Sequence, residues 1–161
     1  MKQEYIDWFL ENIKDKEFIV ASSPSENSWK LYEHYTFGRH EIPFDSDIQS
    51  YLESLIGDSD FKYECYHIHR WKEGYHFDEH TDNLENRKFA YVYELQESEC
   101  KTKLLVEDEP IVEGWFDVHT KHRVPKIQKG ERISLTIFAK NKKTLLSELL
   151  CFYMVHKLLI S

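Results

Sequence analysis

The residues best suited to chemistry form an ordered series in the second half of the chain. His80 and Asp82 flank Thr81, His122 follows Asp82 by forty residues, and ten residues later comes Arg132. Two imidazoles and one carboxylate can bind a divalent iron on one face and leave the other positions open for a co-substrate and oxygen. A planar guanidinium beside such a metal can grip an organic acid through two parallel hydrogen bonds. The series therefore suggests an oxygenase.

The spacing within this series is compatible with extended backbone. Residues two apart in a strand project to the same side, so His80 and Asp82 can both face one ion while Thr81 faces away. A His-x-Asp triplet alone is common in polar loops, and it is the later His122 that makes a metal site plausible. His119, three residues earlier, is an alternative ligand, but the ten-residue step to Arg132 favours His122.

From residue 61 onward the pattern predicts a run of strands. Five segments rich in aromatic and β-branched residues are separated by charged or Gly-containing turns, and no segment between them resembles a crossover helix. Such a run favours an antiparallel sheet over a parallel one. The expected fold is α+β but mainly β, with a double-stranded β-helix (jelly-roll) core built from residues 61–71, 87–96, 102–108, 114–120 and 131–140.

The N-terminal and C-terminal parts are expected to support this core. Apolar residues repeat at three and four positions over residues 5–13 and 48–56, which predicts two amphipathic helices, with a short strand at 18–20. Asp45 and Asp47 can cap the second helix. Residues 22–41, with Trp29, Tyr32 and Tyr35, are a candidate lid or an ordered surface loop.

The chain is expected to be one domain. Residues 1–60 form a helical support region, 61–140 the barrel with the metal site, and 141–161 a C-terminal helix whose apolar face docks on the sheet or forms a dimer seam. Glu148, His156 and Lys157 interrupt its apolar run, so it is too short to span a bilayer.

Composition and charge narrow the class of protein. A chain of 161 residues with 10 Tyr, 10 Phe and 4 Trp can close a packed core. A formal net charge of -8 disfavours nucleic acid as a partner, although Lys140, Lys142 and Lys143 form a local basic cluster. Three cysteines without a close pair predict no disulfide framework. With no secretory signal or membrane anchor, a cytoplasmic location is expected.

At this point residues 61–140 resemble the iron(II)- and 2-oxoglutarate-dependent dioxygenases, and most closely their small prolyl 4-hydroxylase-like members. The resemblance assigns the metal-binding His-x-Asp to His80 and Asp82 and the distal histidine to His122. It assigns to Arg132 the grip on the distal carboxylate of 2-oxoglutarate, and Ser134 on the same strand is expected to share that carboxylate.

Further residues follow from the resemblance. Phe89, Tyr91, Tyr93 and Leu95 alternate onto one strand face, which by similarity to the family lines the co-substrate pocket. Tyr93, and in second place Tyr91, could donate a phenolic hydrogen bond to 2-oxoglutarate or belong to an aromatic core. Thr136 shares a face with Arg132 and either touches the co-substrate or packs. His67 and His69 are candidates for a substrate channel, with a core or surface role as the alternative.

Three positions depart from the family pattern. Trp71 stands where relatives often have a tyrosine, and an indole donates a hydrogen bond but accepts none. The Gly-Gly pair of many relatives is absent from the stretch SECKTKLL. Phe138 stands where relatives that repair alkylated nucleic acid carry a second arginine. These departures bear on the substrate more than on the metal.

The resemblance implies iron(II), 2-oxoglutarate and oxygen as cofactor and co-substrates, with ascorbate as an additional candidate. The expected reaction is hydroxylation of an aliphatic carbon, first of a prolyl or other side chain in a peptide or protein. Oxidative demethylation of alkylated nucleic acid and hydroxylation of a small metabolite are alternatives. A non-catalytic or zinc-binding jelly-roll module is the alternative from another class, since the same ligands suit zinc. No membrane partner is expected.

Overall fold

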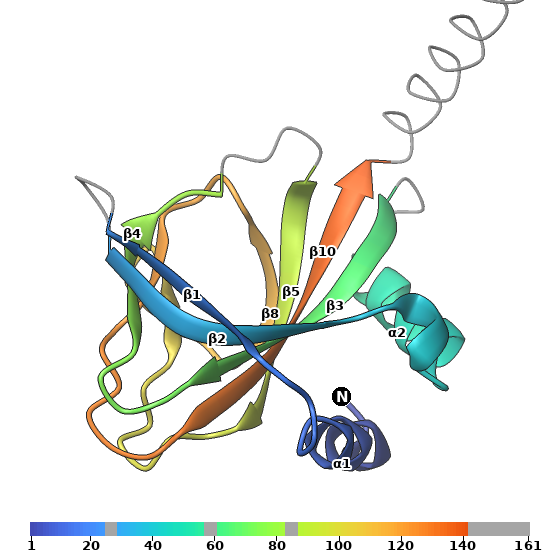
Figure 1. Ribbon diagram of the computed structural model, residues 1–161. Coiled ribbons are helices and arrows are strands. Elements are labelled where there is room, and N and C mark those ends of the chain that lie inside the picture. Colours follow the sequence, from blue (N-terminus) through green and yellow to red (C-terminus); the bar gives the residue numbers. More distant parts are fainter. Residues whose placement is uncertain (25–28, 57–60, 83–86, 142–161) are drawn as a thin grey trace, which may run out of the picture.

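In the part of the chain that the structure describes, two α-helices and one large sheet make up the fold (Figure 1). The computed structural model describes residues 1–24, 29–56, 61–82 and 87–141. The helices are α1 (Gln3–Asn12) and α2 (Asp45–Ile56), and a short 3-10 helix covers Arg39–Glu41. The strands are β1 (Ile19–Pro24), β2 (Trp29–Phe37), β3 (Phe61–Trp71), β4 (His76–His80), β5 (Arg87–Gln96), β6 (Leu104–Val106), β7 (Glu109–Ile111), β8 (Glu113–Asp117), β9 (His122–Val124) and β10 (Arg132–Asn141).

Within these described ranges the strands form a single antiparallel sheet in the order β7-β6-β9-β4-β2-β3-β10-β5-β8, with β1 added beside β2. The sheet curls over on itself, because one buried cluster joins Trp71 of β3 and Val92 of β5 to Leu104 of β6 and Val124 of β9. The predicted mainly-β fold with an antiparallel jelly-roll core is confirmed.

The alternation of side chains along β10 separates the two faces of the sheet. Its odd-numbered residues, from Ile133 to Ala139, join the main hydrophobic core. Its even-numbered residues face the inside of the curled sheet, where they line a pocket that includes Arg132 and Phe138. This is the period of two that a strand imposes on neighbouring side chains. One strand therefore serves both the core and the site.

Both helices cover the outer face of the sheet. Tyr5, Phe9 and Ile13 of the N-terminal segment are buried, as are Ile48 and Leu52 of α2. Their spacing places them on one stripe of each helix, and that stripe packs on the odd face of β10 and its neighbours. Figure 1 shows α1 and α2 on the same side of the sheet, with α2 beside β3 and both helices away from β4. The helices leave the inner face of the sheet uncovered.

A glycine turn sets the start of β10. Gly130 has a φ of +77°, which favours glycine, and a Cβ atom there would lie 3.1 Å from the backbone nitrogen of Glu99. The close approach and the positive φ together require glycine two residues before Arg132. The turn thus fixes where the site arginine enters the sheet.

Three expectations about the supporting regions change or stay open. Residues 1–60 are not only helical, because β1 and β2 lie within them, and the candidate lid at 22–41 consists largely of these strands. Tyr32 of β2 lines the inner pocket directly. The expected C-terminal helix lies, from residue 142 onward, outside the described residues. Among the helices of the described part, none is long and apolar enough to cross a membrane.

Candidate functional site

Three potential metal ligands meet at the junction of β4 and β9. His80 ends β4 and pairs in register with His122, the first residue of β9. Asp82 lies two residues beyond the strand, where its backbone N–H donates to the carbonyl of Val118 at 2.8 Å. One ligand atom from each of the three lies within 4.8 Å of the others. The structure therefore brings together the three ligands expected from the sequence.

The histidines present the nitrogen that a metal needs. His80 Nδ1 lies 2.8 Å from the carbonyl of Asp78, and His122 Nδ1 lies 2.8 Å from the carbonyl of Thr120. A carbonyl only accepts, so both Nδ1 atoms carry the proton and both Nε2 atoms keep a free lone pair. The Nε2 atoms lie 3.6 Å and 3.8 Å from Asp82 Oδ1.

Electrostatics favour the ligand forms of these groups. Burial opposes ionisation of Asp82, but the proximity of His80 and His122 outweighs it and holds the pKa of this carboxyl below its ordinary value. Burial lowers the pKa of His122. At neutral pH the cluster is thus one carboxylate with a neutral imidazole at His122, which is the protonation state that a divalent cation requires.

Arg132 is buried with part of its guanidinium unpaired. Its side chain is 1% exposed, and Nε donates to Glu94 Oε2 at 2.8 Å. Nη2 is buried and has no hydrogen-bond partner among the described residues. An unpaired buried donor of this kind is costly, so it marks a place where an acceptor is expected to bind. A carboxylate is the acceptor that suits a guanidinium best.

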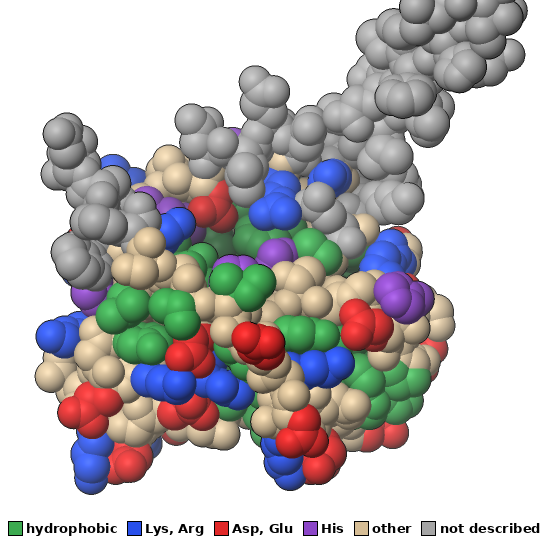
Figure 2. Space-filling model, in the orientation of Figure 1, with side chains coloured by type: hydrophobic (Ala, Val, Ile, Leu, Met, Phe, Trp, Pro, Cys, Tyr) green, Lys and Arg blue, Asp and Glu red, His purple; other side chains and the backbone are tan. Residues whose placement is uncertain are grey.

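One pocket contains both the metal ligands and Arg132. Figure 2 shows a hollow in this face of the molecule, bordered by histidine and hydrophobic side chains. The apolar part of the wall excludes water from the polar groups, and each of its residues comes from a different strand: Tyr32, Trp71, Phe77, Val92, Leu104, Phe116, Val124 and Phe138. A mostly apolar cavity with a few convergent polar groups is the usual form of a small-molecule site.

The remaining polar wall lies along β3 and β10. Ser134 lines the pocket beside Arg132, and its Oγ accepts a hydrogen bond from Trp71 Nε1 at 3.4 Å. Thr136 Oγ1 lies 3.2 Å from His69 Nδ1, and both residues also line the pocket. Trp71, the position that departs from the family pattern, therefore acts on Ser134 as a donor.

Tyr91 and Tyr93 do not lie in this pocket. In the register of β5 with β10, Tyr93 is opposite Leu135 and Tyr91 is opposite Ile137, on the core side of the sheet. The Tyr91 hydroxyl donates to Glu113. The expected pocket face of β5 is thus displaced by one residue, because the helices cover the odd-numbered face and Val92 points inward instead.

Two further sequence expectations can be placed. His119 is exposed and lies outside the cluster of three ligands, and its backbone N–H donates to Asp117. His67 lies next to His69, with ring centroids 6.0 Å apart, but only His69 lines the pocket. The residue that sequence reasoning missed is Glu94. A lone acid in an aromatic strand was the available signal.

Comparisons with known proteins agree with this architecture. The chain matches no protein-family model and no curated protein sequence. Among solved structures, a 2OG-Fe(II) oxygenase family oxidoreductase from Burkholderia pseudomallei matches with a TM-score of 0.66 at 12% identity, over 88% of this chain and 84% of that one. A viral collagen prolyl hydroxylase from Paramecium Bursaria Chlorella virus-1, in a 2OG complex, matches with a TM-score of 0.65 at 16% identity, over 88% and 92%.

The chain has the fold of the 2OG-Fe(II) oxygenases. A third similar structure is the non-heme alpha ketoglutarate dependent carbocyclase SnoK from nogalamycin biosynthesis, with a TM-score of 0.63 at 9% identity, over 88% of this chain and 76% of that one. At such low identity the match concerns the fold. The fold nevertheless accommodates both prolyl hydroxylases and enzymes of small-molecule biosynthesis.

The partly buried His69 predicts a pH dependence of stability. Burial, followed by the proximity of His67, His34 and Arg132, lowers the pKa of His69 well below its ordinary value of 6.5. Below pH 6.5, His69 is protonated in the unfolded chain but stays neutral in the folded one. Through this residue, acid therefore lowers the free energy of unfolding by up to about 1.4 kcal/mol per pH unit. Urea denaturation of the metal-free protein at pH 7.5 and pH 5.5 measures the loss, which His69→Gln is expected to reduce. An unchanged loss in His69→Gln would contradict the assignment.

Proposed function

We propose that this protein is an iron(II)- and 2-oxoglutarate-dependent oxygenase that hydroxylates an aliphatic carbon. The observation that carries the proposal is the single pocket in which His80, Asp82 and His122 lie together with the unpaired Nη2 of Arg132. The fold of the chain supports it. Two histidines and a carboxylate on one face are the ligand set of non-haem iron oxygenases.

The pocket residues have separate roles in binding the metal and the co-substrate. His80 and His122 would bind iron(II) through Nε2, and Asp82 would supply the anionic ligand. Arg132 would bind the distal carboxylate of 2-oxoglutarate with Ser134 beside it, and the aromatic wall would keep water from the reacting groups. Iron(II) with 2-oxoglutarate and oxygen supplies the oxidising chemistry, with release of succinate and carbon dioxide, while the protein contributes binding and orientation.

A zinc hydrolase or a non-catalytic metal module is the competing class. The three ligands alone do not exclude zinc, since it binds histidine and aspartate equally well. Arg132 favours the oxygenase, because a hydrolase has no general need for a buried guanidinium that faces the metal pocket. Ascorbate, if it contributes, would keep the iron reduced rather than occupy a site defined by these residues.

The favoured substrate is a prolyl or other side chain in a peptide or protein. One of the similar structures is a collagen prolyl hydroxylase, which supports this choice, whereas SnoK supports a small metabolite as the second candidate. A net charge of -8 and Phe138 in the pocket wall place alkylated nucleic acid third. Three cysteines without a close pair in the sequence suit a reducing, cytoplasmic location.

Succinate formation tests the proposal. The iron-loaded protein is incubated with 2-oxoglutarate in air, first alone and then with pools of peptides, amino acids and oligonucleotides. We expect slow uncoupled succinate formation alone and a stimulation of about tenfold or more by the peptide pool, because a positioned substrate couples the reaction. Stimulation by another pool reassigns the substrate class. No succinate in any mixture would contradict the oxygenase.

A further inference from the structure

A row of three charged side chains lies behind the pocket. Lys103 Nζ donates to Glu94 Oε1, and Arg132 Nε donates to Glu94 Oε2 at 2.8 Å. Lys103 is 17% exposed, Glu94 4% and Arg132 1%, so this row of charges runs from near the surface into the interior. Lys103 also pairs with Glu97, whose side chain is 46% exposed. Lys103 and Glu94 do not line the pocket, whereas Arg132 does.

The geometry of these three charged side chains differs from that of a simple buried ion pair. A carboxylate beside a guanidinium commonly takes two of its N–H groups in a bidentate fork. Glu94 takes only Nε with one oxygen, because its other oxygen accepts from Lys103. Nη2 of Arg132 therefore keeps no partner among the described residues. Lys103, Glu94 and Arg132 together carry one net positive charge, and the more exposed Glu97 balances it at the outer end beside Lys103.

We propose that Lys103 is a positioning residue that holds Glu94 in a single-oxygen contact with Arg132 and so keeps the guanidinium open for the carboxylate of the co-substrate. This inference rests on the proposed function, since 2-oxoglutarate is the carboxylate concerned. Lys103 acts through Glu94 and contacts neither the three metal-binding residues nor the 2-oxoglutarate site.

Loss of Lys103 has two consequences that act in the same direction. The second oxygen of Glu94 becomes free to turn onto Nη2, which closes the donor that the ligand would use. The net charge of Lys103, Glu94 and Arg132 together also falls from one positive charge to zero. Because a charge-assisted hydrogen bond in a dry site is strong, we expect Lys103→Met to weaken 2-oxoglutarate binding about tenfold.

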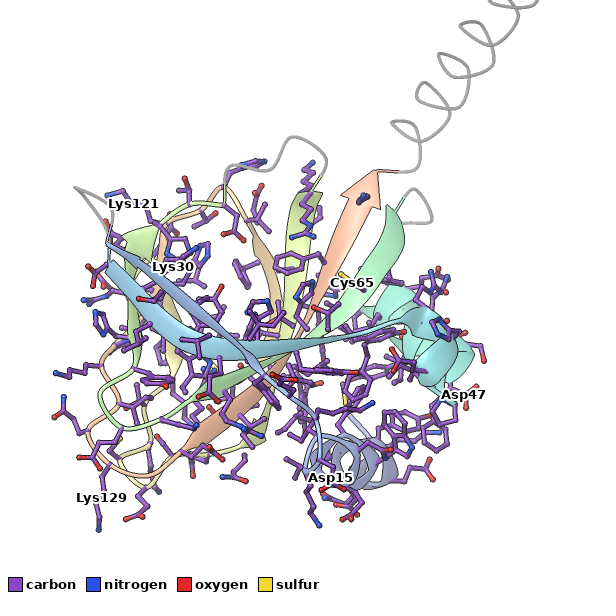
Figure 3. All side chains as sticks on the ribbon, viewed as in Figure 1. Asp15, Lys30, Asp47, Cys65, Lys121 and Lys129 are labelled. Carbon is purple, nitrogen blue, oxygen red and sulfur yellow. The ribbon has the colours of Figure 1, made fainter. Side chains whose placement is uncertain are left out.

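A second substitution separates positioning from structure. In Lys103→Met/Glu94→Gln, the amide can accept one hydrogen bond from Arg132 but cannot form the charged fork, and the net charge returns to one positive. We therefore expect the double variant to regain an affinity within about threefold of the wild type, and Lys103→Arg to retain it. Lys129→Met is the matched control, since Lys129 pairs with Glu99 at 2.8 Å, is 72% exposed and points away from the barrel (Figure 3).

The test is a binding measurement without turnover. Calorimetry of the Mn(II)-loaded, full-length protein gives the Kd of 2-oxoglutarate for each variant, while electron paramagnetic resonance gives the Mn(II) affinity, which is expected to be unchanged because the three ligands are untouched. Urea denaturation reports whether each variant folds. If Lys103→Met folds poorly, Lys103→Gln takes its place.

The outcomes distinguish the two levels of the proposal. Wild-type protein that binds Mn(II) but no 2-oxoglutarate contradicts the proposed function itself. A wild type that binds 2-oxoglutarate, with a Lys103→Met variant of equal affinity, overturns only the positioning role. Weak binding in Lys103→Met that Glu94→Gln does not relieve also overturns it, because the defect would then not pass through Glu94.

Discussion

Asp82→Ala is expected to abolish metal binding and with it 2-oxoglutarate turnover. Asp82 supplies the only anionic ligand in the cluster, and its carboxyl is held ionised by His80 and His122. Even the outer partners of metal ligands commonly contribute 10–100-fold to affinity, so loss of a direct ligand should lower iron(II) binding and succinate formation by at least about 100-fold. Metal analysis after anaerobic reconstitution, together with a succinate assay, measures both.

A matched substitution controls for the loss of an aspartate. Asp15 is exposed at the end of the α1 region, far from the pocket (Figure 3), and Asp15→Ala should bind iron(II) like the wild type. Asp82→Ala should remain folded, since its side chain is 22% exposed and fills no core position. An Asp82→Ala variant that still binds one equivalent of iron(II) and turns over 2-oxoglutarate would contradict the assigned ligand set.

Substitution of Arg132 is expected to produce the second large effect. Arg132→Lys keeps the charge but loses the planar fork, so the KM for 2-oxoglutarate should rise about 10–100-fold while iron(II) affinity stays unchanged. Arg132→Met also removes one partner of a buried ion pair. Because Glu94 is then left with Lys103 alone, the free energy of unfolding should fall by about 3 kcal/mol.

Arg123 provides the comparison for Arg132. Its guanidinium pairs with Asp108 on the surface and is 45% exposed, so Arg123→Met should change stability by less than about 1 kcal/mol and leave the KM unaffected. The comparison uses urea denaturation and steady-state kinetics on the same preparations. Equal KM values in Arg132→Lys and the wild type would show that the carboxylate binds elsewhere.

The inward face of β10, which carries Arg132, was predictable from the sequence. The inward face of the neighbouring strand β5 was not. β10 has polar residues at 132, 134 and 136 and aliphatic residues between them, so its two faces are chemically distinct. The middle of β5 is apolar on both faces, where Ala90 and Val92 alternate with Tyr91 and Tyr93, and alternation cannot tell which face turns inward. The helices decide it by covering Tyr91 and Tyr93, and only tertiary packing reveals that Val92 and Glu94 face the other way.

Strand β2 was missed for a related reason, whereas the short strand predicted at 18–20 overlaps β1. Residues 29–37 mix charged, aromatic and histidine side chains, because Tyr32 faces the pocket while Phe37 faces the core. A strand with aromatic residues toward both a mostly apolar cavity and an apolar core shows no clean alternation of apolar and polar residues. The ligand triad was accessible because residue type and spacing alone encode it, whereas Glu94 depends on a contact 38 residues apart in sequence.

The most direct test of the central claim is an anaerobic titration. Iron(II) and 2-oxoglutarate are added to the protein without oxygen, and the visible absorption spectrum is recorded. We expect a charge-transfer band that needs both components, is absent with zinc, is lost in Asp82→Ala, and requires a higher 2-oxoglutarate concentration in Arg132→Lys. Binding of iron(II) without any such band at saturating 2-oxoglutarate would contradict the assignment of this pocket to iron plus an oxoacid.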